Sequence, residues 1–92
     1  MSVSDVDRER ARRFAEEFRL DCAVRDDFQQ VLDDKQVDVL DVTGPSHVHA
    51  QQGIAAAQAG KHLLVEKPMG VNQYEAQAMI EAAVANGVFL ME

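Results

Sequence analysis

Cysteine and aromatic residues are scarce in this chain of 92 residues, and it has no excess of positive charge. Cys22 stands alone, so a disulfide framework is excluded. The formal net charge of −7 argues against a nucleic-acid partner, because phosphates call for a basic stripe. No apolar run approaches the roughly 18 residues of a membrane span. Polar residues follow Met1 in place of a signal peptide's apolar core, which predicts a cytoplasmic protein without a membrane partner.

Strands and helices alternate along the whole chain, which is long enough for one small domain. The predicted strands are Val3 to Asp5, Asp21 to Val24, Val37 to Val42, His62 to Val65 and Val88 to Met91. Strict alternation indicates βαβ units, and right-handed crossovers then favour a doubly wound α/β fold. Its parallel sheet would carry helices on both faces.

Helix signals lie between these strands. Asp7, Asp26 with Gln29, Pro45 or Ser46, and Asn72 with Glu75 are predicted to open the four helices. Gly60 and Gly87 suit the left-handed position that ends a helix. Apolar residues at helical spacing predict the buried faces. They are Ala11, Phe14, Ala15 and Phe18; Phe28, Val31 and Leu32; Ala50, Ile54 and Ala57; and Ala76, Met79, Ile80, Ala83 and Val84.

Two polar segments follow strands that are predicted to be neighbours. Thr43-Gly44-Pro45-Ser46 comes after one strand, and Glu66-Lys67-Pro68 comes after the next. Parallel strands of a βαβ unit end at the same edge of the sheet, where open α/β sheets bind ligands. The sequence therefore predicts a ligand site at this edge, with Lys67 as a candidate for chemistry.

Four segments resemble one family. SDVDRERARRFAEEF, VDVLDVTGPSHVHA, AGKHLLVEKPMGVNQYEAQAMIEAA and GVFLME follow, in order, the N-terminal domain of the glucose–fructose oxidoreductase / inositol dehydrogenase / MocA family. The most specific element is Glu66-Lys67-Pro68, preceded by Ala59 to His62. Thr43 to His49 is similar to the family's Ala-Thr-Pro-Asn-x-x-His loop.

The resemblance implies a dinucleotide-binding domain that takes NAD or NADP, and hydride transfer to or from a sugar, cyclitol or related hydroxyl carbon. Lys67 matches the family's lysine beside substrate and nicotinamide, where it would stabilise charge on the reacting oxygen. Glu66 would make backbone or orienting contacts. Asp5 matches the acidic residue that binds the adenosine ribose, and its charge slightly favours NAD. The residues expected at the cofactor are Asp5, Thr43, Gly44, Pro45, Ser46, His49, Glu66, Lys67 and Pro68.

The sequence departs from the family in several places. Gly44 replaces a threonine, so a side-chain contact to the cofactor is expected to be lost. The Gly-x-Gly-x-x-Gly turn, the first strand and the later α/β domain are missing. We therefore expect residues 1–92 to form a partial Rossmann domain with a gap in its sheet, inactive by itself. The intact protein is expected to form a homo-oligomer through the missing domain.

Several alternatives accompany this hypothesis. His49 is either part of the cofactor-edge loop or a surface helix residue, and His47 with His49 lacks the further ligands of a zinc site. A phospho-acceptor receiver domain would place another strand and helix between Asp41 and Lys67, so the spacing argues against it. A non-catalytic dinucleotide-sensing or interaction module of the same fold remains an alternative. An X-Pro bond is cis in only about 5–6% of cases, so cis is not predicted before Pro68.

Overall fold

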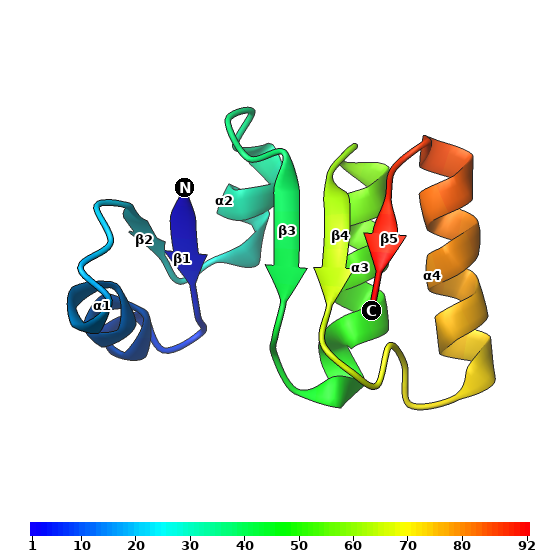
Figure 1. Ribbon diagram of the computed structural model, residues 1–92, viewed down its shortest axis with the longest axis horizontal. Coiled ribbons are helices and arrows are strands. Elements are labelled where there is room, and N and C mark those ends of the chain that lie inside the picture. Colours follow the sequence, from blue (N-terminus) through cyan, green and yellow to red (C-terminus); the bar gives the residue numbers. More distant parts are fainter. The chain divides into compact units, whose positions relative to one another are not determined.

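The computed structural model describes all of residues 1–92, and the chain divides into two compact units. The N-terminal unit is Met1–Val37 and the C-terminal unit is Asp38–Glu92. Each unit is an alternation of strands and helices (Figure 1). No helix combines the length and the apolar composition needed to cross a bilayer.

The N-terminal unit contains a two-stranded parallel sheet and two helices. Its elements are β1 (Ser2–Ser4), α1 (Arg8–Glu17), β2 (Ala23–Arg25) and α2 (Phe28–Asp33). In β1 and β2, Val3 pairs with Val24. Asp7 begins α1 as predicted, since its side chain accepts hydrogen bonds from the backbone N–H groups of Glu9 and Arg10. The chain leaves this helix through Arg19, whose φ of 52° lies in the left-handed region.

Two predictions about this unit are wrong. The residue that caps α2 is Asp27, whose carboxylate accepts from Gln29 N at 2.9 Å, while Asp26 forms an ion pair with Arg8. Phe14 and Phe18 are 48% and 58% exposed rather than buried, although Ala11 and Ala15 on the same helix are buried.

The C-terminal unit contains a three-stranded parallel sheet in the order β3-β4-β5. Its elements are β3 (Val39–Val42), α3 (Ser46–Gln58), β4 (His62–Val65), α4 (Gln73–Asn86) and β5 (Leu90–Met91). The three arrows point the same way, so the loops after β3 and β4 emerge at one edge (Figure 1). Gly60 and Gly87 follow α3 and α4 with φ of 75° and 64°, as predicted.

Alternation along the strands separates two faces of this sheet. Val42, Leu63 and Val65 are buried, and helix α3 contacts β3 and β4. Asp41 pairs with Leu64, which pairs with Met91, and all three are exposed. These residues therefore lie on the face opposite the buried one.

Helix α4 packs mainly on α3. Met79 and Ala83 of α4 are buried against a helix whose inner surface is formed by Gly53, Ala56 and Ala57. The prediction that Ile80 and Val84 belong to the core is wrong, because both side chains are exposed. Small residues on α3 let the two helices approach closely, and this contact buries a narrower stripe of α4 than its apolar spacing predicts.

The predicted fold class, a partial Rossmann α/β fold, is confirmed. All three strand pairings are parallel and no hairpin occurs. The strands form two separate sheets, β1-β2 and β3-β4-β5. Three strands were predicted too early or too long, with observed bounds of Ala23–Arg25, Val39–Val42 and Leu90–Met91.

Candidate functional site

The loops after β3 and β4 form the candidate site of the C-terminal unit. The two strands meet in register through Val42 and Val65, and the ladder continues one step further where Glu66 N donates to Val42 O at 2.9 Å. Thr43 and Lys67 therefore leave adjacent strands at the same edge. This is the carboxyl edge at which open α/β sheets bind ligands.

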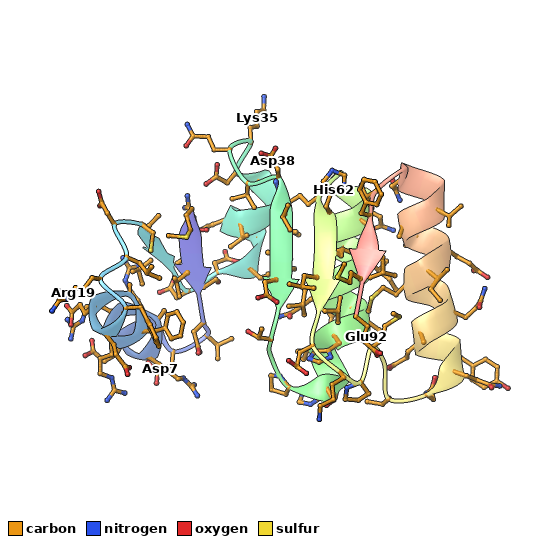
Figure 2. The ribbon with its side chains drawn as sticks, in the orientation of Figure 1. Asp7, Arg19, Lys35, Asp38, His62 and Glu92 are labelled. Carbon is orange, nitrogen blue, oxygen red and sulfur yellow. The ribbon has the colours of Figure 1, made fainter.

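An open cavity of about 360 Å³ lies at this edge. Its lining residues are Asp41, Thr43, Leu64, Val65, Glu66, Lys67 and Glu92. Figure 2 shows Glu92 at this end of the sheet and His62 at the opposite end of β4. The lining combines an apolar floor with carboxylates, a hydroxyl and one ammonium group, which suits a polar ligand with a flat apolar part.

Three of the cavity residues were predicted as site residues, namely Thr43, Glu66 and Lys67. Four were not, namely Asp41, Leu64, Val65 and Glu92. The alternation of β3 and β4 carried a signal for two of them, because Asp41 and Leu64 are partners in register and point to the same face as each other. Glu92 could not be found this way, since it follows the short strand β5.

The backbone around Lys67 is fixed by several hydrogen bonds. Lys67 N donates to Glu66 Oε1 at 2.9 Å, which is the backbone contact predicted for Glu66. Met69 N donates to Glu92 Oε2 at 2.8 Å. The bond between Lys67 and Pro68 is cis, which the sequence did not predict. The segment thus has a defined path, although the Lys67 side chain itself is exposed.

The Lys67 ammonium group is available to a ligand. None of the six ion pairs in the structure includes it. Its side chain lines the cavity beside the apolar atoms of Leu64 and Val65. A lysine without a carboxylate partner in such a cavity can donate a hydrogen bond to an anionic or polarised oxygen.

The loop after β3 leads directly into helix α3. Pro45 is the N-cap residue and provides no side-chain cap, and Ser46 is the first helical residue, as predicted. A Cβ atom at Gly44 would lie 3.3 Å from Val48 Cγ2, so this turn has little room for a side chain. The glycine therefore fits the close packing of its own turn.

His49 is completely buried, with 1% of its surface exposed, so the alternative of a surface helix residue is wrong. Its Nδ1 lies 2.8 Å from Pro68 O and its Nε2 lies 2.7 Å from Gly44 O. The ring thus joins the loop after β3 to the loop after β4. Both ring nitrogens have protein partners.

Asp5 lies in the N-terminal unit, at the end of β1. Its Oδ1 accepts from Asp7 N at 2.8 Å, and its Oδ2 lies 3.0 Å from Arg10 Nε. The carboxylate is partly exposed, with 29% of the side chain accessible. Each carboxylate oxygen has a further lone pair, so Asp5 can accept additional hydrogen bonds from a ligand.

One pairing on α1 shifts the pKa values of both its partners. The hydrogen bond from Arg12 lowers the pKa of the exposed Glu9 below its ordinary value of 4.5. The same pairing raises the pKa of Arg12. These groups form a charged face on α1.

Comparison with known proteins identifies the family of this chain. Residues 1–92 match the model of the oxidoreductase family GFO_IDH_MocA, which has an NAD-binding Rossmann fold. Inositol 2-dehydrogenase of Salmonella paratyphi B is 30% identical over 87 residues, which are 95% of this chain and 26% of that enzyme.

Two solved structures are similar throughout. Levoglucosan dehydrogenase in complex with NADH and levoglucosan has a TM-score of 0.87 and 31% identity, over 97% of this chain and 24% of that one. A 3-ketoreductase from Actinomadura kijaniata in complex with TDP-benzene and NADP has a TM-score of 0.91 and 30% identity, over 100% and 28%. The chain spans about a quarter of the length of the relatives that it matches. The match along the whole chain shows that this protein belongs to the Gfo/Idh/MocA family of oxidoreductases with an NAD-binding Rossmann fold.

Proposed function

We propose that residues 1–92 form part of the dinucleotide-binding domain of an NAD(P)-dependent oxidoreductase. The reaction is hydride transfer between the nicotinamide and a sugar, cyclitol or related hydroxyl carbon. The observation that carries the proposal is the unpaired Lys67 in the cavity at the carboxyl edge of β3 and β4, together with membership in this family. The names of the relatives, inositol 2-dehydrogenase and levoglucosan dehydrogenase, support the class of substrate.

The donor set fits a dinucleotide. Asp5 can accept hydrogen bonds from the adenosine ribose hydroxyls, as the acidic residue at this position of a Rossmann unit does. In the C-terminal unit, Thr43 offers a hydroxyl, and the exposed Leu64 offers an apolar surface for a flat ring. When bound, the nicotinamide supplies the hydride acceptor or donor. We propose contacts to the same cofactor from Gly44, Pro45, Ser46, Glu66 and Pro68, as the resemblance implies. The resemblance also implies His49, but its buried ring binds Gly44 O and Pro68 O, so we propose that it acts through these two loops.

Lys67 is the candidate catalytic residue. Its ammonium group would donate a hydrogen bond to the substrate oxygen that gains negative charge as the hydride leaves or arrives. A donor that is held in place before the reaction stabilises this developing charge. Glu66 positions the lysine by accepting the hydrogen bond from its backbone N–H.

NAD is the cofactor that we favour slightly over NADP. The Asp5 carboxylate would repel a 2′-phosphate, although Arg10 at 3.0 Å offsets part of this charge. A preference for NADP of tenfold or more would refute this choice of cofactor.

We also propose a cytoplasmic location, which agrees with the free Cys22. A homo-oligomer formed through a region outside residues 1–92 stays a prediction.

The test of the proposal is substitution of Lys67 in the full-length enzyme. Lys67→Ala should reduce kcat by roughly 10²-fold or more, as loss of a preorganised donor does. The Kd of the cofactor should change much less. Lys67→Arg should also be poor, because a planar guanidinium cannot replace a compact ammonium group in a tight site.

Lys35 provides the control, because it is an exposed lysine outside the candidate site (Figure 2). Lys35→Ala should leave kcat unchanged. If Lys67→Ala keeps nearly full kcat, the catalytic assignment is wrong. If the wild-type protein binds the dinucleotide but turns over no sugar or cyclitol, the non-catalytic sensing module becomes the better account.

A further inference from the structure

One imidazole ring connects the two loops of the candidate site. His49 lies in the first turns of α3, yet its ring reaches the carbonyl of Gly44 after β3 and the carbonyl of Pro68 after β4. These loops lie side by side at the same edge of the sheet (Figure 1). The side chain is 1% exposed, so water does not compete for either nitrogen.

The two partners fix where the hydrogens of the ring must be. A carbonyl oxygen only accepts hydrogen bonds, whereas a neutral imidazole has one N–H and one lone pair. At 2.8 Å and 2.7 Å both contacts have the length of short hydrogen bonds. A neutral ring would place a nitrogen lone pair against a carbonyl lone pair at one of these distances. Both nitrogens therefore need a hydrogen.

The other two histidines differ from His49 in this respect. His62 Nδ1 accepts a hydrogen bond from Phe89 N at 3.0 Å, so this nitrogen carries no hydrogen. His47, on the same helix as His49, is exposed. The chain thus offers three histidines in three different settings, and two of them serve as internal references.

We infer that His49 is an imidazolium that clamps the loops after β3 and β4 and thereby positions the backbone that carries Lys67. The clamp itself rests on the hydrogen bonds of His49. Its effect on catalysis rests in addition on the function proposed above for Lys67.

The carboxylates near His49 bind other groups, which supports the two carbonyls as the partners of its ring. Glu66 accepts from Lys67 N, Glu92 from Met69 N, and Glu75 from Val71 N, so none of these hydrogen bonds involves the ring. The titratable groups on the elements around His49 are Asp41, His47, His62, Glu66, Lys67, Tyr74, Glu75, Glu81 and Glu92. None forms an ion pair or a hydrogen bond with His49. The carbonyl oxygens of Gly44 and Pro68 are therefore the groups that face the two ring nitrogens.

The direct test is ¹⁵N NMR of the histidine rings in the uniformly labelled chain near neutral pH. Both ring nitrogens of His49 should carry a directly bonded hydrogen that exchanges slowly with solvent. His62 should show a hydrogen-free Nδ1. The variants His47→Gln and His62→Gln assign the signals by removing one histidine each. A hydrogen-free ring nitrogen at His49 in the folded chain would overturn the inference.

The functional test uses the full-length enzyme and a graded pair of variants. His49→Gln keeps one amide donor for one of the two carbonyls, and His49→Phe keeps none. We expect kcat to fall in the order wild type, His49→Gln, His49→Phe, with a loss approaching roughly 10²-fold for the last, as expected for a displaced catalytic group. The cofactor Kd should change by much less than kcat.

The two tests separate failure of the clamp from failure of the proposed function. The NMR result requires no catalysis and also holds if His49→Phe does not fold. If both variants keep wild-type kcat per folded molecule, His49 is only a structural residue and the positioning role is refuted. If the wild type is inactive while both nitrogens are protonated, the clamp stands and the proposed function fails.

Discussion

The packing of α3 on α4 depends on the absence of a side chain at Gly53. A Cβ atom at this position would lie 2.8 Å from Met79 Sδ and 2.9 Å from Met79 Cε. Carbon atoms in good contact are roughly 3.5–4.0 Å apart. Met79 is 0% exposed, so the end of its side chain has no solvent to move into. Gly53→Ala should therefore overpack this interface.

Two effects of opposite sign decide the free energy of unfolding. Overpacking a well-packed core costs about 1–3 kcal/mol. Replacing glycine by alanine in a helix interior stabilises the folded state by about 1 kcal/mol. We therefore expect Gly53→Ala to destabilise the protein by up to about 2 kcal/mol. Urea unfolding followed by circular dichroism measures this change, and the slope with urea should stay constant.

A second background separates the two effects. Met79→Val removes Sδ and Cε, the two nearest of the three Met79 atoms that the new methyl group would meet. In that background Gly53→Ala should stabilise the protein by about 1 kcal/mol, which is the helix propensity alone. Gln51 is exposed on the same helix, so the difference between Gln51→Gly and Gln51→Ala calibrates that propensity. If Gly53→Ala has the same effect with Met79 and with Val at position 79, the inferred contact is wrong.

Asn72→Ala should destabilise the protein by about 1 kcal/mol, because the Asn72 side chain accepts a hydrogen bond from Glu75 N at the start of α4. Asn72→Asp keeps the acceptor and is the control in the same urea unfolding assay. Arg12→Met should raise the pKa of Glu9 towards its ordinary value, since the hydrogen bond from Arg12 is the largest cause of its lowered pKa. Arg13 contributes less, so Arg13→Met should move the Glu9 carboxyl titration by a smaller amount in ¹³C NMR. Because the folded pKa is lowered, the stabilisation from Glu9 is present above the unfolded pKa and is lost as the pH falls through the folded one.

The alternation of strands and helices could be predicted because hydrophobic spacing and caps are local. Asp7, Asn72, Gly60 and Gly87 all occupy the predicted positions at helix ends. The starts of three strands could not be predicted in this way, and β5 shows why. Val88 N donates to Ala83 O at 3.1 Å, so this valine belongs to the end of α4 and β5 starts later. Apolar composition alone does not distinguish a strand from the turn that leads into it.

The sequence also did not predict how much of each helix surface is buried. Periodicity identifies the side of a helix that faces the protein, but it does not say how wide the covered stripe is. In α1 the small Ala11 and Ala15 reach the interior, whereas Phe14 and Phe18 stay at its border and pack on each other with ring centroids 4.7 Å apart. A large apolar residue at the right spacing can therefore remain half exposed.

The candidate site divides in a similar way between local and non-local information. Thr43 and Lys67 could be placed at one edge because both strands of a parallel βαβ unit end at the same edge of the sheet. The role of His49 could not be read from its neighbours, since its partners Gly44 and Pro68 come from two loops on either side of it in the chain. Only the folded backbone shows that both ring nitrogens face carbonyl oxygens.

The hydrogen bonds around Lys67 fix the backbone that carries its exposed side chain. Each hydrogen bond near it fixes backbone rather than the ammonium group. Glu66 binds the backbone N–H of Lys67, Glu92 binds that of Met69, and His49 binds the carbonyl of Pro68. In the proposed function the lysine would supply the charge, and these three side chains would set where that charge can reach. Substitutions at Glu66 or His49 should therefore alter turnover through the position of Lys67 while its own side chain remains intact.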